Sequence, residues 1–210
     1  MVGGRFCVGV KVVWVVADGR MGRNMTTTWF KKWWVIAILV VVVALYGALV
    51  VYRIFAIGAE EKTAEAVERI HGMALTMADV TGENLPPRPG AAEAVATIAG
   101  VDANENGIRD DVEHAIFDKY PDDIKIRAAM LQYAMALQME FTEVVNSETL
   151  VAVIQEQSRG SLCISNMNKK NEIIDFVLNT ETRQQHVEEV RNRYMTSYSL
   201  PTEKECDLEL

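Results

Sequence analysis

Residues 102–113 place oxygen-bearing side chains at the spacing that a cation-binding loop requires, in the order D-A-N-E-N-G-I-R-D-D-V-E. Polar residues at alternate positions of a curling chain turn their oxygens toward one point, and Gly107 permits the left-handed turn that folds the chain around an ion. A flexible shell of about seven oxygens suits calcium better than magnesium, which demands a tighter octahedron. The predicted ligands are Asp102, Asn104, Asn106, Ile108 through its carbonyl oxygen, Asp110 and Glu113.

This stretch matches the EF-hand loop pattern D-x-[DN]-x-[DN]-G-x5-E at every specified position. It resembles the single EF-hand-like and dockerin-like calcium loops of exported and membrane-anchored bacterial envelope proteins, which have the form D-x-N-x-N-G-x-R-D-D-x-E. The resemblance covers the loop and its flanks, and it implies a single calcium site with the same ligands but no particular activity. It departs from the usual pattern because Gly100, just before the loop, makes the entering helix short or absent, and because no second loop follows.

The loop residues also have an interpretation without metal. Asp110 and Glu113 have the spacing of a capping box for the following helix, and Asn106-Gly107 is an ordinary turn sequence. A turn followed by a helix cap would need no ion.

No motif of a known catalytic site accompanies the loop. The chain lacks H-E-x-x-H, G-x-S-x-G and a phosphate-binding glycine loop, and its three histidines are isolated, with His114 expected on a solvated helix face. We therefore expect no catalytic residues. The alternative is a metal-dependent hydrolase with an unrecognised site near Asp110, Asp111 and Glu113.

An apolar stretch without a single charge, WWVIAILVVVVALYGALVVY, occupies residues 33–52. A helix rises about 1.5 Å per residue, so this stretch is long enough to cross a hydrocarbon core of about 30 Å. Tryptophan and tyrosine near its ends suit the membrane interface. The stretch predicts a transmembrane helix over residues 33–55.

Charge predicts the orientation of this helix. All but one of the 29 acidic residues follow Arg53, whereas Lys31 and Lys32 directly precede the apolar stretch. Because positive residues stay on the cytoplasmic side, we expect a single-pass protein of a bacterial inner membrane with a cytoplasmic amino terminus and a periplasmic carboxy-terminal part. The alternative is a signal peptide cleaved near Ala56-Ile57-Gly58.

Four segments are expected along an all-α chain. Residues 1–32 form a cytoplasmic tail, of which residues 1–24 have an interpretation as an over-extended gene start, and residues 33–55 span the membrane. Residues 56–90 form a stalk helix (60–80) and a proline-rich spacer, and residues 91–210 form a small exported helical bundle that carries the calcium-type loop. In the bundle we expect helices over 110–120, from Pro121 to about 145, from a Ser147 cap to 157 before Gly160, over 171–178 and over 182–197.

We expect a calcium-stabilised interaction module rather than an enzyme, because the helices supply few buried titratable candidates for catalysis. The acidic balance after the apolar stretch excludes nucleic acid as a partner, since nothing there would neutralise phosphates. We expect the membrane and another envelope protein as partners.

Cys163 and Cys206 can form a disulfide on an oxidising side of the membrane, while Cys7 stays reduced; the alternative is two free thiols.

Overall fold

The computed structural model describes residues 23–164, 166–201 and 206–208, with the backbone alone for residues 23–31. The described residues form α-helices and no strand. The chain divides into two compact units, Met1–Ile57 and Gly58–Leu210. The interpretation of residues 1–24 as an over-extended gene start and the expectation for Cys7 concern positions that lie almost wholly outside the described residues.

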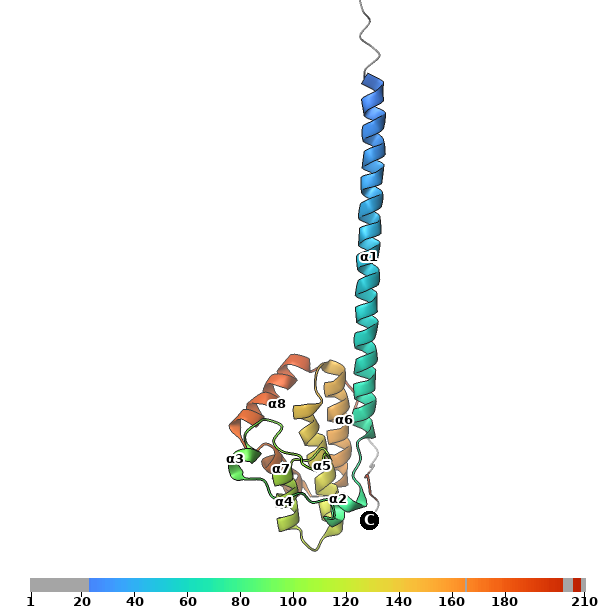
Figure 1. Cartoon of the computed structure of the whole chain (residues 1–210). Coiled ribbons are helices and arrows are strands. Elements are labelled where there is room, and N and C mark those ends of the chain that lie inside the picture. Colours follow the sequence, from blue (N-terminus) through green and yellow to red (C-terminus); the bar gives the residue numbers. More distant parts are fainter. Residues whose placement is uncertain (1–22, 165, 202–205, 209–210) are drawn as a thin grey trace, which may run out of the picture. The chain divides into compact units, whose positions relative to one another are not determined.

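Helix α1 (Arg23–Gly72) contributes to both units (Figure 1). From Trp33 to Ile57 its large apolar side chains are exposed. In the described part of the chain this is the one helix that is long and apolar enough to cross a membrane, with a mean hydropathy of 2.9 over an 18-residue window. The expectation of an apolar helix near the amino terminus is therefore confirmed.

The predicted stalk helix over 60–80 is wrong in its extent. Helix α1 continues without a break through Gly58 and ends at Gly72, and a short helix α2 (Met77–Thr81) begins after four intervening residues. The helix is interrupted there because Thr76 caps α2. The Thr76 hydroxyl accepts a hydrogen bond from Asp79 N, and Thr76 N donates to the Asp79 carboxylate at 2.8 Å.

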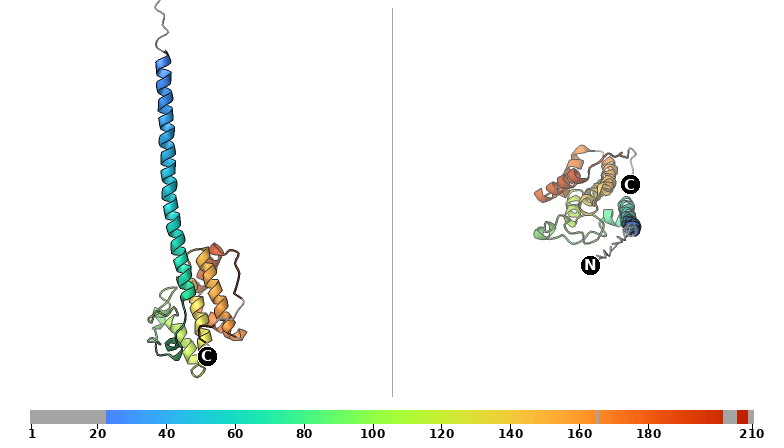
Figure 2. Two further views of the ribbon diagram at one scale, coloured as in Figure 1. Left: turned by 90° about the vertical axis from the view of Figure 1, so that its right-hand side faces the viewer. Right: turned by 90° about the horizontal axis from the view of Figure 1, so that it is seen from above.

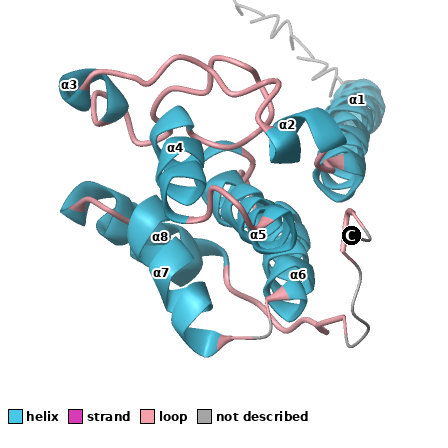
Figure 3. Cartoon of the chain, turned by 90° about the horizontal axis from the view of Figure 1, so that it is seen from below, coloured by secondary structure: helices cyan, strands magenta, loops and turns pink. Residues whose placement is uncertain are grey.

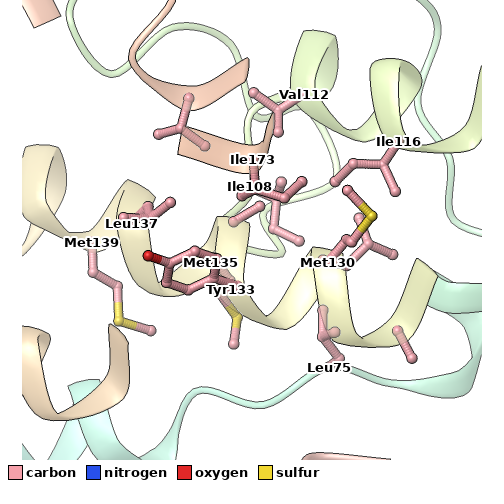
Figure 4. Packing of buried hydrophobic residues seen from close by; sticks show 14 of the residues in the cluster. Leu75, Ile108, Val112, Ile116, Met130, Tyr133, Met135, Leu137, Met139 and Ile173 are labelled. Atoms are coloured by element: carbon pink, nitrogen blue, oxygen red, sulfur yellow. The ribbon is translucent and has the colours of Figure 1, made fainter. Parts of the chain in front are cut away.

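The helical domain, which is the second unit, is built around α5 (Ile124–Thr142). Helix α5 contacts α2, α4 (Asp110–Lys119), α6 (Ser147–Cys163), α7 (Met167–Val177) and α8 (Glu181–Tyr194), and Figure 3 shows it in the middle of these helices. Two faces of this helix carry buried apolar side chains, as a central helix requires: Met130, Tyr133 and Leu137 lie on one face, and Ala128, Leu131 and Met135 lie on the other. The core contains Ile70, Leu75, Ile108, Val112, Ile116, Met130, Leu131, Met135, Met139 and Ile173 (Figure 4).

The start of α5 differs from the prediction. Pro121 lies before the helix rather than in its first turn, and Asp123 is the cap, with its carboxylate accepting a hydrogen bond from Ile126 N at 3.0 Å. The buried Arg127 side chain donates to the carbonyl oxygens of Tyr120 and Pro121, which holds the turn in a non-helical conformation.

Helices α5 and α6 pack side by side (Figure 2). Asn146 caps α6, not Ser147 as predicted, because its side chain accepts from Glu148 N and Thr149 N at 3.0 Å. The helix also continues through Gly160, where a stop was predicted. A Cβ atom at position 160 would lie 3.0 Å from the Tyr133 Cα, so the glycine permits close contact with α5.

The remaining helices follow the predicted pattern with shifted ends. Helix α3 (Ala91–Ala94) is a single short turn before the loop, and α4, α7 and α8 match the helices expected at 110–120, 171–178 and 182–197. The Cys163 and Cys206 sulfurs lie at disulfide distance, with Cα atoms 5.8 Å apart, as the predicted pairing requires.

Candidate metal site

The loop over residues 102–113 closes around the Asp102 carboxylate. Asp102 accepts hydrogen bonds from Asn106 N at 3.1 Å and from Gly107 N at 2.8 Å. Gly107 has a φ of 82°, the left-handed conformation that the sequence predicted, and a Cβ atom there would lie 2.6 Å from the Met73 Cε. The glycine therefore serves both the turn and the contact of the loop with the segment that follows α1.

Glu113 points from the first turns of α4 into the loop. Its side chain is almost fully buried, with 1% exposed, and accepts a hydrogen bond from Asn106 Nδ2 at 2.8 Å. Asn104 Nδ2 lies 3.3 and 3.4 Å from its two carboxylate oxygens. The structure thus brings the third, fifth and twelfth positions of the loop together.

The capping-box interpretation is wrong. Arg109, not Asp110, occupies the cap position of α4 and makes no side-chain cap bond. The Asp110 carboxylate instead accepts from Ala103 N at 2.9 Å across the loop, and Asp110 N donates to the Val101 carbonyl. Glu113 and Asp110 therefore stabilise the closed loop rather than the exposed end of a helix.

Burial and repulsion govern the electrostatics of the loop. Burial, together with the charges of Asp110 and Asp102, raises the pKa of Glu113 to about 7, although the hydrogen bonds from Asn106 and Asn104 oppose the rise. Burial also raises the pKa of Asp102, against the hydrogen bonds from Gly107 and Asn106. Three acidic groups are therefore enclosed together, and a bound cation would offset the cost of their ionisation.

The segment around α2 covers the loop, a contact that sequence reasoning missed. Burial would raise the pKa of Asp79, but the hydrogen bonds that it accepts from Thr76, Asn84 and Asn106 outweigh burial and lower it. Asn104 Nδ2 also donates to the Asn84 carbonyl at 3.0 Å. The Thr76-x-x-Asp79 capping box was a visible signal for α2, but not for its contact with the loop.

The predicted ligands carry oxygen atoms, which suit a hard cation, but they are not arranged as a complete coordination shell. In the described residues, no group of three or more His, Cys, Asp or Glu side chains is placed to hold a metal ion directly. The amide groups of Asn104 and Asn106 lie between the carboxylates and turn their nitrogens toward Glu113. Coordination would require these amides to present Oδ1 instead, and the Ile108 side chain lies in the core, so only its carbonyl can serve.

Arg109 and Asp111 form a separate cluster. The fully buried Arg109 donates to Asp111 at 2.5 and 3.0 Å and to the Phe176 and Val177 carbonyl oxygens at the end of α7, each at 3.1 Å. Asp111 also accepts from Asn179. Asp111 therefore does not join Asp110 and Glu113, as the hydrolase hypothesis would need.

Two histidines differ from their expected surroundings. His114 is buried rather than solvated, with its Nε2 atom 2.8 Å from the Pro86 carbonyl oxygen. The His71 Nδ1 atom lies 2.7 Å from Glu156 Oε1, and Glu156 also binds Arg159. Neither contact has a local sequence signal, because the partners are 28 and 85 residues apart.

Comparison of the chain with protein-family models, curated proteins and solved structures gave no match. Its function must therefore be argued from the loop, the apolar helix and the surfaces of the helical domain.

Proposed function

We propose that this protein is a single-pass membrane protein that displays a calcium-binding helical domain as a non-catalytic interaction module. The module lies on the periplasmic side of a bacterial inner membrane, the amino terminus is cytoplasmic, and another envelope protein is the partner.

The exposed apolar surface of α1 supports the anchor. Such a surface is costly in water and suits lipid, and a helix satisfies its own backbone hydrogen bonds in a bilayer. Lys31 and Lys32 before it and the acidic excess after it support the orientation.

The inward orientation of the buried Glu113 is the observation that carries the calcium proposal. A metal-free helix cap would leave this carboxylate at the helix end, whereas it lies among Asn104 and Asn106, at the twelfth position of an EF-hand sequence. Asp102 and Asp110 complete a loop of three carboxylates whose mutual repulsion a divalent cation would relieve.

The proposal is tested by melting the metal-stripped full-length protein in phosphatidylcholine nanodiscs, with millimolar calcium or with chelator. Binding to the folded state alone contributes about 2.7 kcal/mol at a hundredfold excess of calcium over Kd, so we expect the Tm to rise by about 5 to 10 °C. Asp102→Ala and Glu113→Gln should each abolish the rise. Asp102→Ala should also lower the Tm in chelator, because Asn106 N and Gly107 N lose their acceptor.

The matched control is Asp122→Asn, which removes one exposed carboxylate outside the loop and should keep the full calcium shift. The calcium proposal is wrong if the parent protein does not shift, or if both loop variants shift as much as the parent.

A further inference from the structure

The last described residues of the chain, 206–208, connect the segment that follows α1 to α6. The Asp207 carboxylate, with 2% of its side chain exposed, accepts hydrogen bonds from Leu75 N at 3.0 Å and from Arg159 Nη1 at 2.6 Å. Leu75 lies between α1 and α2, and Arg159 lies on α6. Residues 206–208, the clamp segment, therefore hold these two parts of the domain together.

Two further side chains extend this connection to α1 itself. Arg159 also donates to Glu156 on α6 at 2.7 Å, and the other oxygen of that carboxylate lies 2.7 Å from His71 Nδ1 in the last turn of α1. On its backbone side, Asp207 N donates to Gln132 of α5 at 3.2 Å. A continuous set of polar contacts therefore joins the clamp segment to the end of α1.

The Cys163–Cys206 disulfide fixes the clamp segment covalently to α6. Cys163 is the last residue of α6, and Cys206 directly precedes Asp207. Without this bond, the clamp segment would be attached to the helices only through residues 195–205, the connection that follows α8. A longer chain connection gives a lower effective concentration than a direct cross-link, so the polar contacts of Asp207 alone would hold the segment less firmly.

The disulfide lies where a reductant can reach it and where its loss would act locally. Both cysteines are partly exposed. Arg159 is partly exposed as well, so water would solvate its charge once Asp207 has left. The clamp segment contributes to the core only through Leu208, which packs at its edge. Release of the clamp segment should therefore loosen the end of α1 and leave the packing around α5 in place.

We propose that the Cys163–Cys206 disulfide is a redox-controlled latch for the end of α1. A dithiol reductant breaks the Sγ–Sγ bond through a mixed disulfide: it supplies two electrons and two protons, becomes a disulfide itself and leaves two protein thiols. The clamp segment then leaves Leu75 N and Arg159, and the segment after α1 is released. A disulfide oxidant takes the two electrons and two protons back and closes the latch. This device does not depend on the cation site.

The test follows amide hydrogen exchange of the full-length protein in phosphatidylcholine nanodiscs and chelator, before and after dithiothreitol without denaturant. Iodoacetamide labelling of a separate sample should show that Cys163 and Cys206 become free thiols in the folded protein. Exchange at Leu75 should rise by about tenfold or more, because its amide loses the Asp207 acceptor. Exchange at Leu131, in the middle of α5, should stay unchanged, and oxidised glutathione should restore slow exchange at Leu75.

Asp207→Ala separates the contacts of the clamp segment from the disulfide. With the bond intact, this variant should already exchange rapidly at Leu75, and dithiothreitol should add little. The matched control is Asp175→Ala, which removes an exposed carboxylate from α7 and should respond to dithiothreitol as the parent does. The double variant Cys163→Ser/Cys206→Ser should exchange like the reduced parent and not respond to dithiothreitol.

The latch would be disproved by a disulfide that reacts only in denaturant, or by reduction that leaves exchange at Leu75 unchanged. Slow exchange at Leu75 in the Asp207→Ala variant would also overturn it. An equal rise at Leu75 and Leu131 would contradict it as well, because the bond would then stabilise the whole domain rather than the end of α1.

Discussion

Glu113 is the residue at which burial and charge conflict most strongly. Its carboxylate is enclosed in the loop with Asp102 and Asp110 nearby, and the amide nitrogens of Asn104 and Asn106 replace only part of the water that it loses. In the metal-free protein this conflict favours the protonated acid.

The free energy of unfolding of the metal-free protein should therefore depend on Glu113 between pH 4.5 and about 7. In that range the folded protein holds a proton that the unfolded chain releases, because the pKa is about 7 in the folded state against an ordinary 4.5. Stability consequently falls as pH rises through this range. In chelator, the stability of Glu113→Gln should decrease less as the pH rises, so that the variant melts above the parent at pH 8 and not at pH 5.

Glu188→Gln is the control for this pH series, since that side chain is exposed on α8. It should follow the parent protein at every pH. Identical pH profiles for the parent and Glu113→Gln would show that Glu113 does not retain its proton in the folded state.

At the level of single residues, the sequence predicted the loop and its glycine but not the buried arginine side chains. The alternation of Asp102, Asn104 and Asn106 is local, so it can be recognised without knowing the fold. Arg109 gave no such signal, because its partners are carbonyl oxygens at the end of α7, 67 and 68 residues away. A long-range contact of this kind depends on which helix ends meet, and periodicity does not contain that information.

At the level of elements, the contact between α5 and α6 depends on Gly160. Glycine in a helix costs about 1 kcal/mol relative to alanine, so Gly160→Ala would stabilise α6 if it were isolated. In the domain, the new methyl group meets the backbone of Tyr133, with 3.0 Å to Cα and 3.3 Å to N.

Gly160→Ala should therefore lower the Tm of the domain, because the backbone of α5 cannot turn aside as a flexible side chain can. Gly72→Ala is the matched control, since a Cβ atom at the end of α1 meets nothing within 4 Å, and this variant should leave the Tm unchanged or slightly raised. Thermal melting followed by circular dichroism compares the two. An increase in Tm for Gly160→Ala would show that α5 and α6 can move apart without a loss of stability.

Elements with strong local signals were predicted well and their ends less so. Helix α5 is apolar on two faces and α4 directly follows the loop, and both helices were predicted, although α5 begins later than expected. The end of α1 at Gly72 and the restart at Met77 were missed, because the apolar period continues across the break. The cap at Thr76 and the distant Asp207, which accepts from Leu75 N, determine where the helix stops.

At the scale of the whole molecule, an exported domain should carry a bonded cysteine pair. Thiol labelling of the denatured, unreduced protein should then modify Cys7 and neither Cys163 nor Cys206, whose Cα atoms are 5.8 Å apart. Trypsin added to spheroplasts should remove the part of the chain beyond the apolar helix. Labelling of all three cysteines, or protection of the domain from trypsin, would contradict the periplasmic location.

The position of Asp207 has a consequence for how the domain is made. Its backbone and side chain form hydrogen bonds with Leu75, Gln132 and Arg159, each of which lies at least 48 positions earlier in the chain. The next residue, Leu208, packs against the core. Contacts of such sequence separation form late, and a ribosome delivers these residues after every helix of the bundle. The domain therefore completes its native contacts only after synthesis has reached residue 208.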